Sequence, residues 1–187
     1  NTGCPVRREP HTPGVPVGRR GWLSMLRWLR SNTWERSIFG SDQHLGIDPR
    51  VLRHVRRYRQ SREGQPEAGG QLFGTVTKSL VRISAASGPH RSDQRSRYAF
   101  RSNPHTAQTF IEAHAERGLL YLGEWHTHAE NVPSPSETDV SALRAILQNS
   151  QLNTDALVLM IVGLARPDAD LGVWYMKRTR LLLECIR

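Results

Sequence analysis

The segment that most constrains the fold is a strand-like run that ends in two histidines and leads into a capped helix. Residues 119–128 are apolar and β-prone, and they end in the sequence E-W-H-T-H (124–128). Side chains alternate along a strand, so His126 and His128 are expected on the same face. Trp125 would then face the opposite way, into the core.

The helix predicted after this strand brings a carboxylate and a hydroxyl to the same end of it. Residues 133–148 have helical periodicity and contain the sequence S-P-S-E (134–137). This pattern predicts a capping box with Ser134 as the N-cap and the glutamate reaching back. Asp139 is then expected in the second turn, and Ser136, three residues earlier, shares its face.

Two histidines and an aspartate at this spacing predict a metal site. Zinc accepts imidazole nitrogen and carboxylate oxygen, and a catalytic zinc usually has three protein ligands and a water. We therefore predict that His126, His128 and Asp139 bind one zinc ion. The histidine pair alone is a weak signal, since two half-buried strand histidines would look the same. The full pattern with Ser136 and Asp139 would arise by chance in about one such sequence per thousand.

The remaining pattern predicts a mixed α/β (α+β) domain. Helices are expected at residues 48–58, where Asp48 precedes Pro49, and at 106–117, which ends at Gly118. Strands are expected at 34–39, 80–85, 98–101, 119–128, 156–165 and 171–177. The strand at 80–85 is expected to pair with the strand before it, in the segment 67–74. His105 and His114 are interpreted as capping or packing residues.

We expect a boundary near residue 33. Residues 1–32 are rich in proline and arginine and carry six arginines against one acid. We predict that this extension is mostly disordered, with a short helix near Trp22 that packs on the body or binds a partner or membrane surface. Residues 33–187 form the expected domain.

Charge and cysteine usage limit the partners. The net charge is +9, of which the extension contributes +5, so an acidic partner is possible, but no aromatic-basic motif supports nucleic-acid binding. No segment approaches the roughly 18 apolar residues of a membrane span. Cys4 and Cys185 are too few for a disulfide scaffold. We interpret both as reduced and expect the cytoplasm.

Three motifs together resemble a known family. They are E-A-G-G-x-L-F-G (67–74), G-E-W-H-T-H (123–128) and P-S-x-x-D (135–139). This combination is similar to the JAMM signature of JAB/MPN metalloproteases, and the resemblance covers residues 34–178. Residues 97–100 and 121–126 are most similar to the peptidases of CBASS anti-phage operons. Ala129 stands where many relatives have proline, and residues 1–33 match nothing in the family.

The resemblance implies a JAB/MPN fold, a curved mixed sheet flanked by helices, and a zinc-dependent isopeptidase. It implies that Glu67 is the general base and that Ser136 donates to the oxyanion. The implied substrate is a CD-NTase or ubiquitin-like protein conjugated through its C-terminus by an E1–E2-like enzyme.

Several alternatives stay open from the sequence. They are a peptidase of another ubiquitin-like or sulfur-carrier pathway, a metal-free MPN scaffold, and a nucleic-acid binder that uses the basic extension. Glu124 either orients a histidine or the substrate, or is a solvated acid at the strand end. Gly69, Gly70 and Gly74 are expected to let the backbone pass close to the site.

Overall fold

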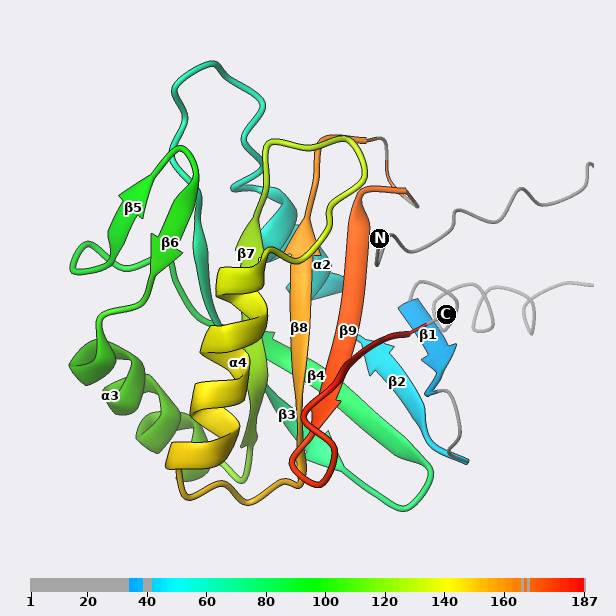
Figure 1. The fold of residues 1–187 in the computed structure, drawn as a ribbon. Coiled ribbons are helices and arrows are strands. Elements are labelled where there is room, and N and C mark those ends of the chain that lie inside the picture. Colours follow the sequence, from blue (N-terminus) through cyan, green and yellow to red (C-terminus); the bar gives the residue numbers. More distant parts are fainter. Residues whose placement is uncertain (1–33, 39–41, 166, 168, 187) are drawn as a thin grey trace, which may run out of the picture.

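The protein is built around one mixed eight-stranded sheet, shown by a computed structural model that describes residues 34–38, 42–165, 167 and 169–186 (Figure 1). The strand order is β1-β2-β4-β3-β7-β8-β9-β10. The strands are β1 (Trp34–Ser37), β2 (His44–Ile47), β3 (Gly69–Val76), β4 (Leu80–Ala86), β7 (Leu120–Thr127), β8 (Ala156–Val162), β9 (Leu171–Lys177) and β10 (Leu183–Cys185). A separate hairpin joins β5 (Gln94–Ser96) to β6 (Ala99–Arg101). The predicted α+β class with a mixed sheet is confirmed.

Helix α2 (Pro49–Arg56) covers one face of this sheet. Its apolar stripe, Val51, Leu52 and Val55, is buried against residues from the central strands, including Trp125. Proline at the first position starts the helix, as predicted. The side chain of Asp48 makes no capping hydrogen bond, however, because its carboxylate is paired with Arg82 at 2.7 Å.

Helix α4 (Glu137–Asn149) covers the opposite face, and in Figure 1 it lies in front of the sheet, over β7, while α2 lies behind the sheet. Leu143 and Leu147 pack there against the odd-numbered residues of β8. The even-numbered residues of β8 pack on the α2 side. Burial on both faces explains why residues 156–162 form an unbroken apolar run.

The third helix, α3 (Pro104–Ala115), packs on β7 and β3 beside α4. It begins at Asn103, whose side chain accepts a hydrogen bond from the Thr106 amide. The predicted packing role of His114 is confirmed, since its ring stacks on Phe73 at a centroid distance of 3.8 Å.

Some expectations were wrong or incomplete. The sequence did not predict β2, β5 or β10, which are only three or four residues long. Cys185 is disulfide-bonded, so the expectation that it is reduced is wrong. The predicted disorder of residues 1–32 and the helix near Trp22 lie outside the described residues, and the boundary near residue 33 stays a prediction. Within the described ranges, no helix has the length and apolar character needed to cross a membrane.

Candidate metal and catalytic site

Antiparallel pairing of β3 with β7 brings Glu67 close to the two histidines. Gly69 lies opposite His126 in the register between β3 and β7. Glu67 is two residues before Gly69, so its side chain is on the same side of the sheet as that of His126. Two hydrogen bonds between Ala68 and Thr127 extend the pairing beyond Gly69, at 2.8 and 3.0 Å. The Glu67 amide donates to the Ser96 carbonyl at 2.8 Å, which ties this segment to the β5–β6 hairpin. Glu67 is therefore fixed in place and only 6% exposed.

Gly69 makes this close approach possible. A Cβ atom at this position would collide with the Phe100 ring and with the Trp125 carbonyl oxygen. The expectation that the glycines let the backbone pass close to the site is therefore confirmed at Gly69.

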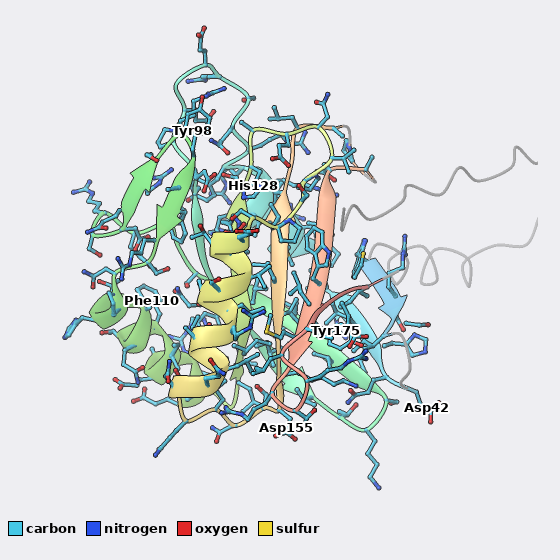
Figure 2. All side chains as sticks on the ribbon, viewed as in Figure 1. Asp42, Tyr98, Phe110, His128, Asp155 and Tyr175 are labelled. Carbon is cyan, nitrogen blue, oxygen red and sulfur yellow. The ribbon has the colours of Figure 1, made fainter. Side chains whose placement is uncertain are left out.

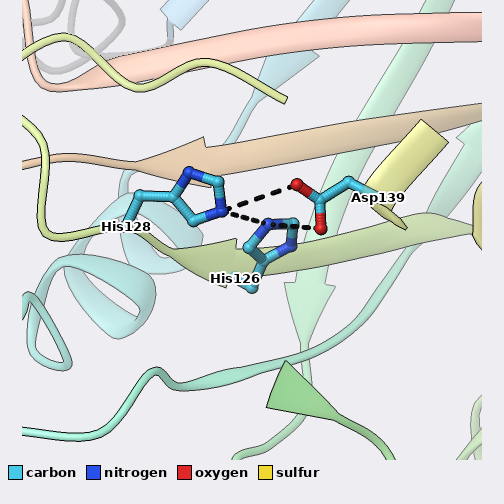
Figure 3. A group of neighbouring side chains, drawn as sticks. All are labelled: His126, His128 and Asp139. Carbon is cyan, nitrogen blue, oxygen red and sulfur yellow. Dashed lines mark hydrogen bonds and ion pairs between the residues drawn. The ribbon is translucent and has the colours of Figure 1, made fainter. Parts of the chain in front are cut away.

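The side chains of His126, His128 and Asp139 converge at the end of β7 where α4 begins (Figures 2 and 3). His126 Nε2 lies 3.0 Å from His128 Nε2 and 3.3 Å from Asp139 Oδ1. His128 Nε2 lies 3.5 Å from Asp139 Oδ2. One potential ligand atom from each residue lies within 4.8 Å of the others, so the three side chains can hold one metal ion. Two imidazoles and a carboxylate are a common ligand set of a catalytic zinc.

The start of α4 differs from the prediction by two residues. Ser136 is the N-cap, not Ser134, and Asp139 is the third residue of the first turn. Ser136 donates both its amide and its hydroxyl to Asp139 Oδ2, each at 2.7 Å, and accepts from the Asp139 amide at 3.2 Å. Ser134 instead donates its amide and hydroxyl to Glu130. The capping box thus fixes the side chain of Asp139 in the direction of the histidines.

The ionisation of Asp139 and of His128 suits metal binding. Burial acts to raise the pKa of Asp139, but hydrogen bonds and charge from His126 and hydrogen bonds from Ser136 outweigh it and hold the pKa well below its usual range. The pKa of His128 is lowered, first by burial and then by His126, against the opposing effect of Asp139 and Glu130. A neutral imidazole and an ionised carboxylate are the forms that bind a metal.

The carboxyl group of Glu67 differs from that of Asp139, because its pKa is raised and not lowered. Burial raises its pKa to about 7; His126 lowers it in part, while Asp139 and Glu130 raise it. A carboxyl group with a pKa near neutral pH can both accept and return a proton under ordinary conditions.

Comparison with known proteins agrees with this fold. Residues 49–176 match the family of prokaryotic homologs of the JAB domain. The chain belongs to this family.

Relatives of this JAB protein carry a more specific name. A protein named CD-NTase/cGAS isopeptidase from Escherichia coli is 31% identical over 135 residues, which are 70% of this chain and 82% of the relative. Its namesake from Vibrio cholerae is 32% identical over 79% of this chain and 90% of the relative. The one from Pseudomonas aeruginosa is 39% identical over 49% of this chain and 60% of the relative. The resemblance to CBASS JAB peptidases is confirmed.

One solved structure supports the fold of this JAB domain. The solution structure of protein DSY2949 from Desulfitobacterium hafniense superposes with a TM-score of 0.54. It is 19% identical and covers 74% of this chain and 87% of that one. At this identity the likeness concerns the fold alone.

A groove of about 480 Å³ leads away from the candidate metal ligands of this JAB domain. His126 and Asp139 line it, and its walls come from α3, α4, β7 and the end of β6. Most of its side chains are apolar, among them Phe100, Ile111 and Leu143. The site is therefore open to a ligand along one side.

Two residues that the sequence did not assign to the site lie beside it. Glu130 Oε2 lies 3.9 Å from His128 Nδ1, close enough to influence the orientation of that ring. Glu124 lies in the groove wall and accepts hydrogen bonds from Tyr121 and Gln71. Burial raises the pKa of Glu124 to about 7, although those two hydrogen bonds and the charge of His126 lower it. A solvated acid at the strand end is therefore the wrong interpretation of Glu124.

Proposed function

We propose that the protein is a zinc-dependent isopeptidase. The observation that carries this proposal is the convergence of His126, His128 and Asp139 beside the buried carboxyl group of Glu67. A metal-free scaffold would have no need of this arrangement, because a buried and unpaired carboxyl group destabilises a fold. The isopeptidases among the relatives support the same reaction.

In this proposal each residue has a distinct role. His126, His128 and Asp139 hold zinc, which when bound supplies an activated water and polarises the scissile carbonyl. Glu67 accepts the proton of the attacking water and returns it to the departing amine, so that one residue serves both transfers. Water adds to the carbonyl carbon, the C–N bond breaks, and an acid and an amine are released.

We assign the stabilisation of the oxyanion to the Ser136 hydroxyl. This hydroxyl donates to Asp139 Oδ2 in the structure. It has a single proton, so the proposed role requires that it turn from Asp139 to the oxyanion when substrate is bound. A donor in such a position is worth roughly 3 kcal/mol in comparable sites.

The proposed substrate is a CD-NTase whose C-terminus is joined to a target protein by an E1–E2-like enzyme. The name shared by the relatives supports this choice. We place the reaction in anti-phage defence in the cytoplasm, with residues 33–187 sufficient for cleavage and residues 1–32 dispensable. A peptidase of another ubiquitin-like or sulfur-carrier pathway would use the same site on a different protein.

Zinc content and cleavage, measured together, test the proposal. Wild-type protein is expected to contain one zinc per chain and to release a CD-NTase from a conjugate through its C-terminus. His126→Ala is expected to lose both the zinc and the activity. His105→Ala is the matched control, since it removes an exposed histidine on α3 outside the ligand group. Equal zinc in His126→Ala and wild type would overturn the metal assignment.

The choice of substrate needs a second comparison. A CD-NTase conjugate and a ubiquitin-like fusion with the same reporter lysine are incubated with the wild-type protein and with a chain that starts at Thr33. Cleavage of the ubiquitin-like fusion alone would favour the alternative pathway. A folded short chain that loses all activity would contradict the proposed dispensability of residues 1–32.

A further inference from the structure

A β-bulge in β7 gives the groove a feature that regular strand geometry would not produce. In the pairing with β3, Leu72 lies opposite Gly123 but Phe73 lies opposite Tyr121, so Leu122 has no counterpart. Gly123 has a φ of 141°, and a Cβ atom there would collide with the backbone of Val158 on β8. Glycine is therefore needed at this position.

The bulge places Tyr121 and Glu124 on the same side of the strand. Residues three apart in a regular strand point to opposite faces. Here the Tyr121 hydroxyl donates to Glu124 Oε1 at 2.5 Å. Both residues line the groove next to α3 and α4.

A second contact fixes the other oxygen of Glu124. The Gln71 side-chain amide donates to Glu124 Oε2 at 3.3 Å and to Ser102 Oγ at 2.9 Å. Gln71 is itself 1% exposed, and its oxygen accepts from Ser87 Oγ at 2.7 Å. The carboxyl group of Glu124 is thus held in one orientation by a chain of neutral groups.

In the part of the chain that the structure describes, no lysine or arginine pairs with this carboxyl group. Arg101, which also lines the groove, is exposed. An ionised carboxylate has about four acceptor positions, of which Tyr121 and Gln71 use two. Glu124 therefore has free acceptor capacity and uncompensated charge in an apolar groove, where a charge-assisted hydrogen bond is strong.

The distance from Glu124 to the metal-binding end of the groove sets which substrate residue it would meet. Glu124 and His126 are two residues apart on one face, which corresponds to about 7 Å along a strand. An extended peptide in the groove, with its scissile carbonyl at His126, would cover the same distance in two residues.

We propose that Glu124 is a specificity-determining residue that selects lysine or arginine two positions before the residue that carries the scissile carbonyl. This inference rests on the proposed isopeptidase activity. The occupant of the groove is the extended C-terminal tail of the conjugated protein, and its basic side chain pairs with the free acceptor positions of Glu124. The apolar side chains of α3 and α4 contact the rest of that tail.

Peptide tails with one varied position test this inference. The probes are six-residue peptides joined through their C-terminal carboxyl group to the ε-amine of a lysine in a fluorescent reporter. The residue two positions before the scissile one is lysine, methionine or glutamate. Wild type is expected to cleave the lysine peptide with a kcat/KM about 10-fold above that of the methionine peptide. The glutamate peptide is expected to be the poorest substrate.

Glu124→Gln keeps the size of the side chain and removes its charge. We expect this variant to retain zinc and its preference for the lysine peptide over the methionine peptide to fall to about 2-fold or less. Tyr121→Phe, which releases one oxygen of Glu124, should reduce the preference in part. Glu112→Gln removes an exposed charge from α3 and should leave the preference unchanged.

Three outcomes would overturn the inference: no preference for lysine in wild type, an unchanged preference in Glu124→Gln, or an equal loss with every peptide. If no peptide is cleaved, the proposed activity is without support, and calorimetric binding of the same peptides decides. Lysine-selective binding that is lost in Glu124→Gln supports the inference separately from catalysis, whereas equal binding of all three peptides overturns it.

Discussion

Acidic side chains on the two sides of the sheet differ in whether a cation pairs with them. On the α2 side, Asp170 is fully buried and receives two hydrogen bonds from Arg56, at 2.8 and 2.9 Å, and another from Arg59. Asp48 is 6% exposed and pairs with Arg82 and Arg50. Arg56 and Arg59 belong to the basic stretch that starts in α2, so part of the positive charge of this stretch compensates an acid in the interior.

On the α4 side, Glu67 and Glu124 form no ion pair with lysine or arginine in the described part of the chain. Burial raises the pKa of each to about 7. A carboxylate that stabilises a fold is compensated by a cation, whereas one that must exchange a proton or meet a ligand cannot be. This difference supports the roles proposed for Glu67 and Glu124 and a structural role for Asp170 and Asp48.

Neutralising Glu67 should have the largest effect, and on activity alone. We expect Glu67→Gln to lower turnover by about 10²- to 10⁴-fold, because the departing amine would no longer receive a proton. Its zinc content should equal that of wild type. Turnover and bound zinc are measured in parallel, with Glu63→Gln in the exposed loop as the control. Loss of zinc would instead make Glu67 a ligand, and unchanged turnover would remove it as the base.

Neutralising Asp170 should have the opposite result. Asp170→Asn leaves two arginines without their buried partner, and we expect the free energy of unfolding to fall by about 3 kcal/mol. Activity per folded molecule should not change. Urea denaturation measures the loss, and Asp155→Asn, an exposed acid before β8, provides the control. A stable Asp170→Asn variant with impaired turnover would remove the distinction between the two sides.

The pH dependence of stability should distinguish the acids next. The pKa of Glu67 is about 7 in the folded protein and lies near 4.5 in an unfolded chain, so its ionisation destabilises the fold. This penalty is absent below pH 4.5, grows between pH 4.5 and about 7, and is constant at higher pH. In metal-free protein, the stability of Glu67→Gln relative to wild type should therefore increase from pH 5 to pH 8, by on the order of 1 kcal/mol.

The comparison between variant and wild type cancels the contributions of His128 and Asp139, which both proteins share. Chemical denaturation at the two pH values gives the difference. A constant difference in stability would show that Glu67 is well hydrated and would weaken its assignment as a functional acid.

The smallest effect is expected at the edge of the α2 side. The side chain of Arg50 is 72% exposed, and it lies 3.4 Å from Asp48 Oδ2. Exposed ion pairs contribute about 0–1 kcal/mol, so Arg50→Ala should cost less than about 0.5 kcal/mol. Arg82→Ala is measured in parallel by thermal unfolding. The guanidinium of Arg82 lies 2.7 Å from Asp48 Oδ1, so this variant should lose more stability than Arg50→Ala. Equal losses would show that exposure does not determine the value of these pairs.

Local patterns predicted the convergence of His126, His128 and Asp139 better than the surroundings of these residues. Strand alternation was sufficient to place His126 and His128 together, and helix periodicity brought Asp139 near them. The sequence pattern placed the N-cap of α4 at Ser134, whereas the structure has it at Ser136. The choice between these two serines depends on Glu130, which accepts hydrogen bonds from Ser134. A tertiary contact of this kind is not visible in a local pattern.

Strand pairing explains the remaining gaps. The position of Glu67 depends on the register between β3 and β7, and here the family resemblance supplied what periodicity could not. The surroundings of Glu124 depend on the bulge at Gly123, which exists only because β7 lies between β3 and β8. Strand β2 escaped prediction because its four residues include Gly46 and its main support is parallel pairing with β4.

The capping box of α4 has a consequence for how a metal would be captured. The side chain of Asp139 is held by the backbone and hydroxyl of Ser136 before any ion arrives. Its rotational freedom is thus lost when the chain folds, and the binding step does not have to supply that ordering. The first turn of α4 therefore presents a preoriented carboxylate to the two histidines at the end of β7. The metal affinity of such a site therefore depends on the stability of one helical turn.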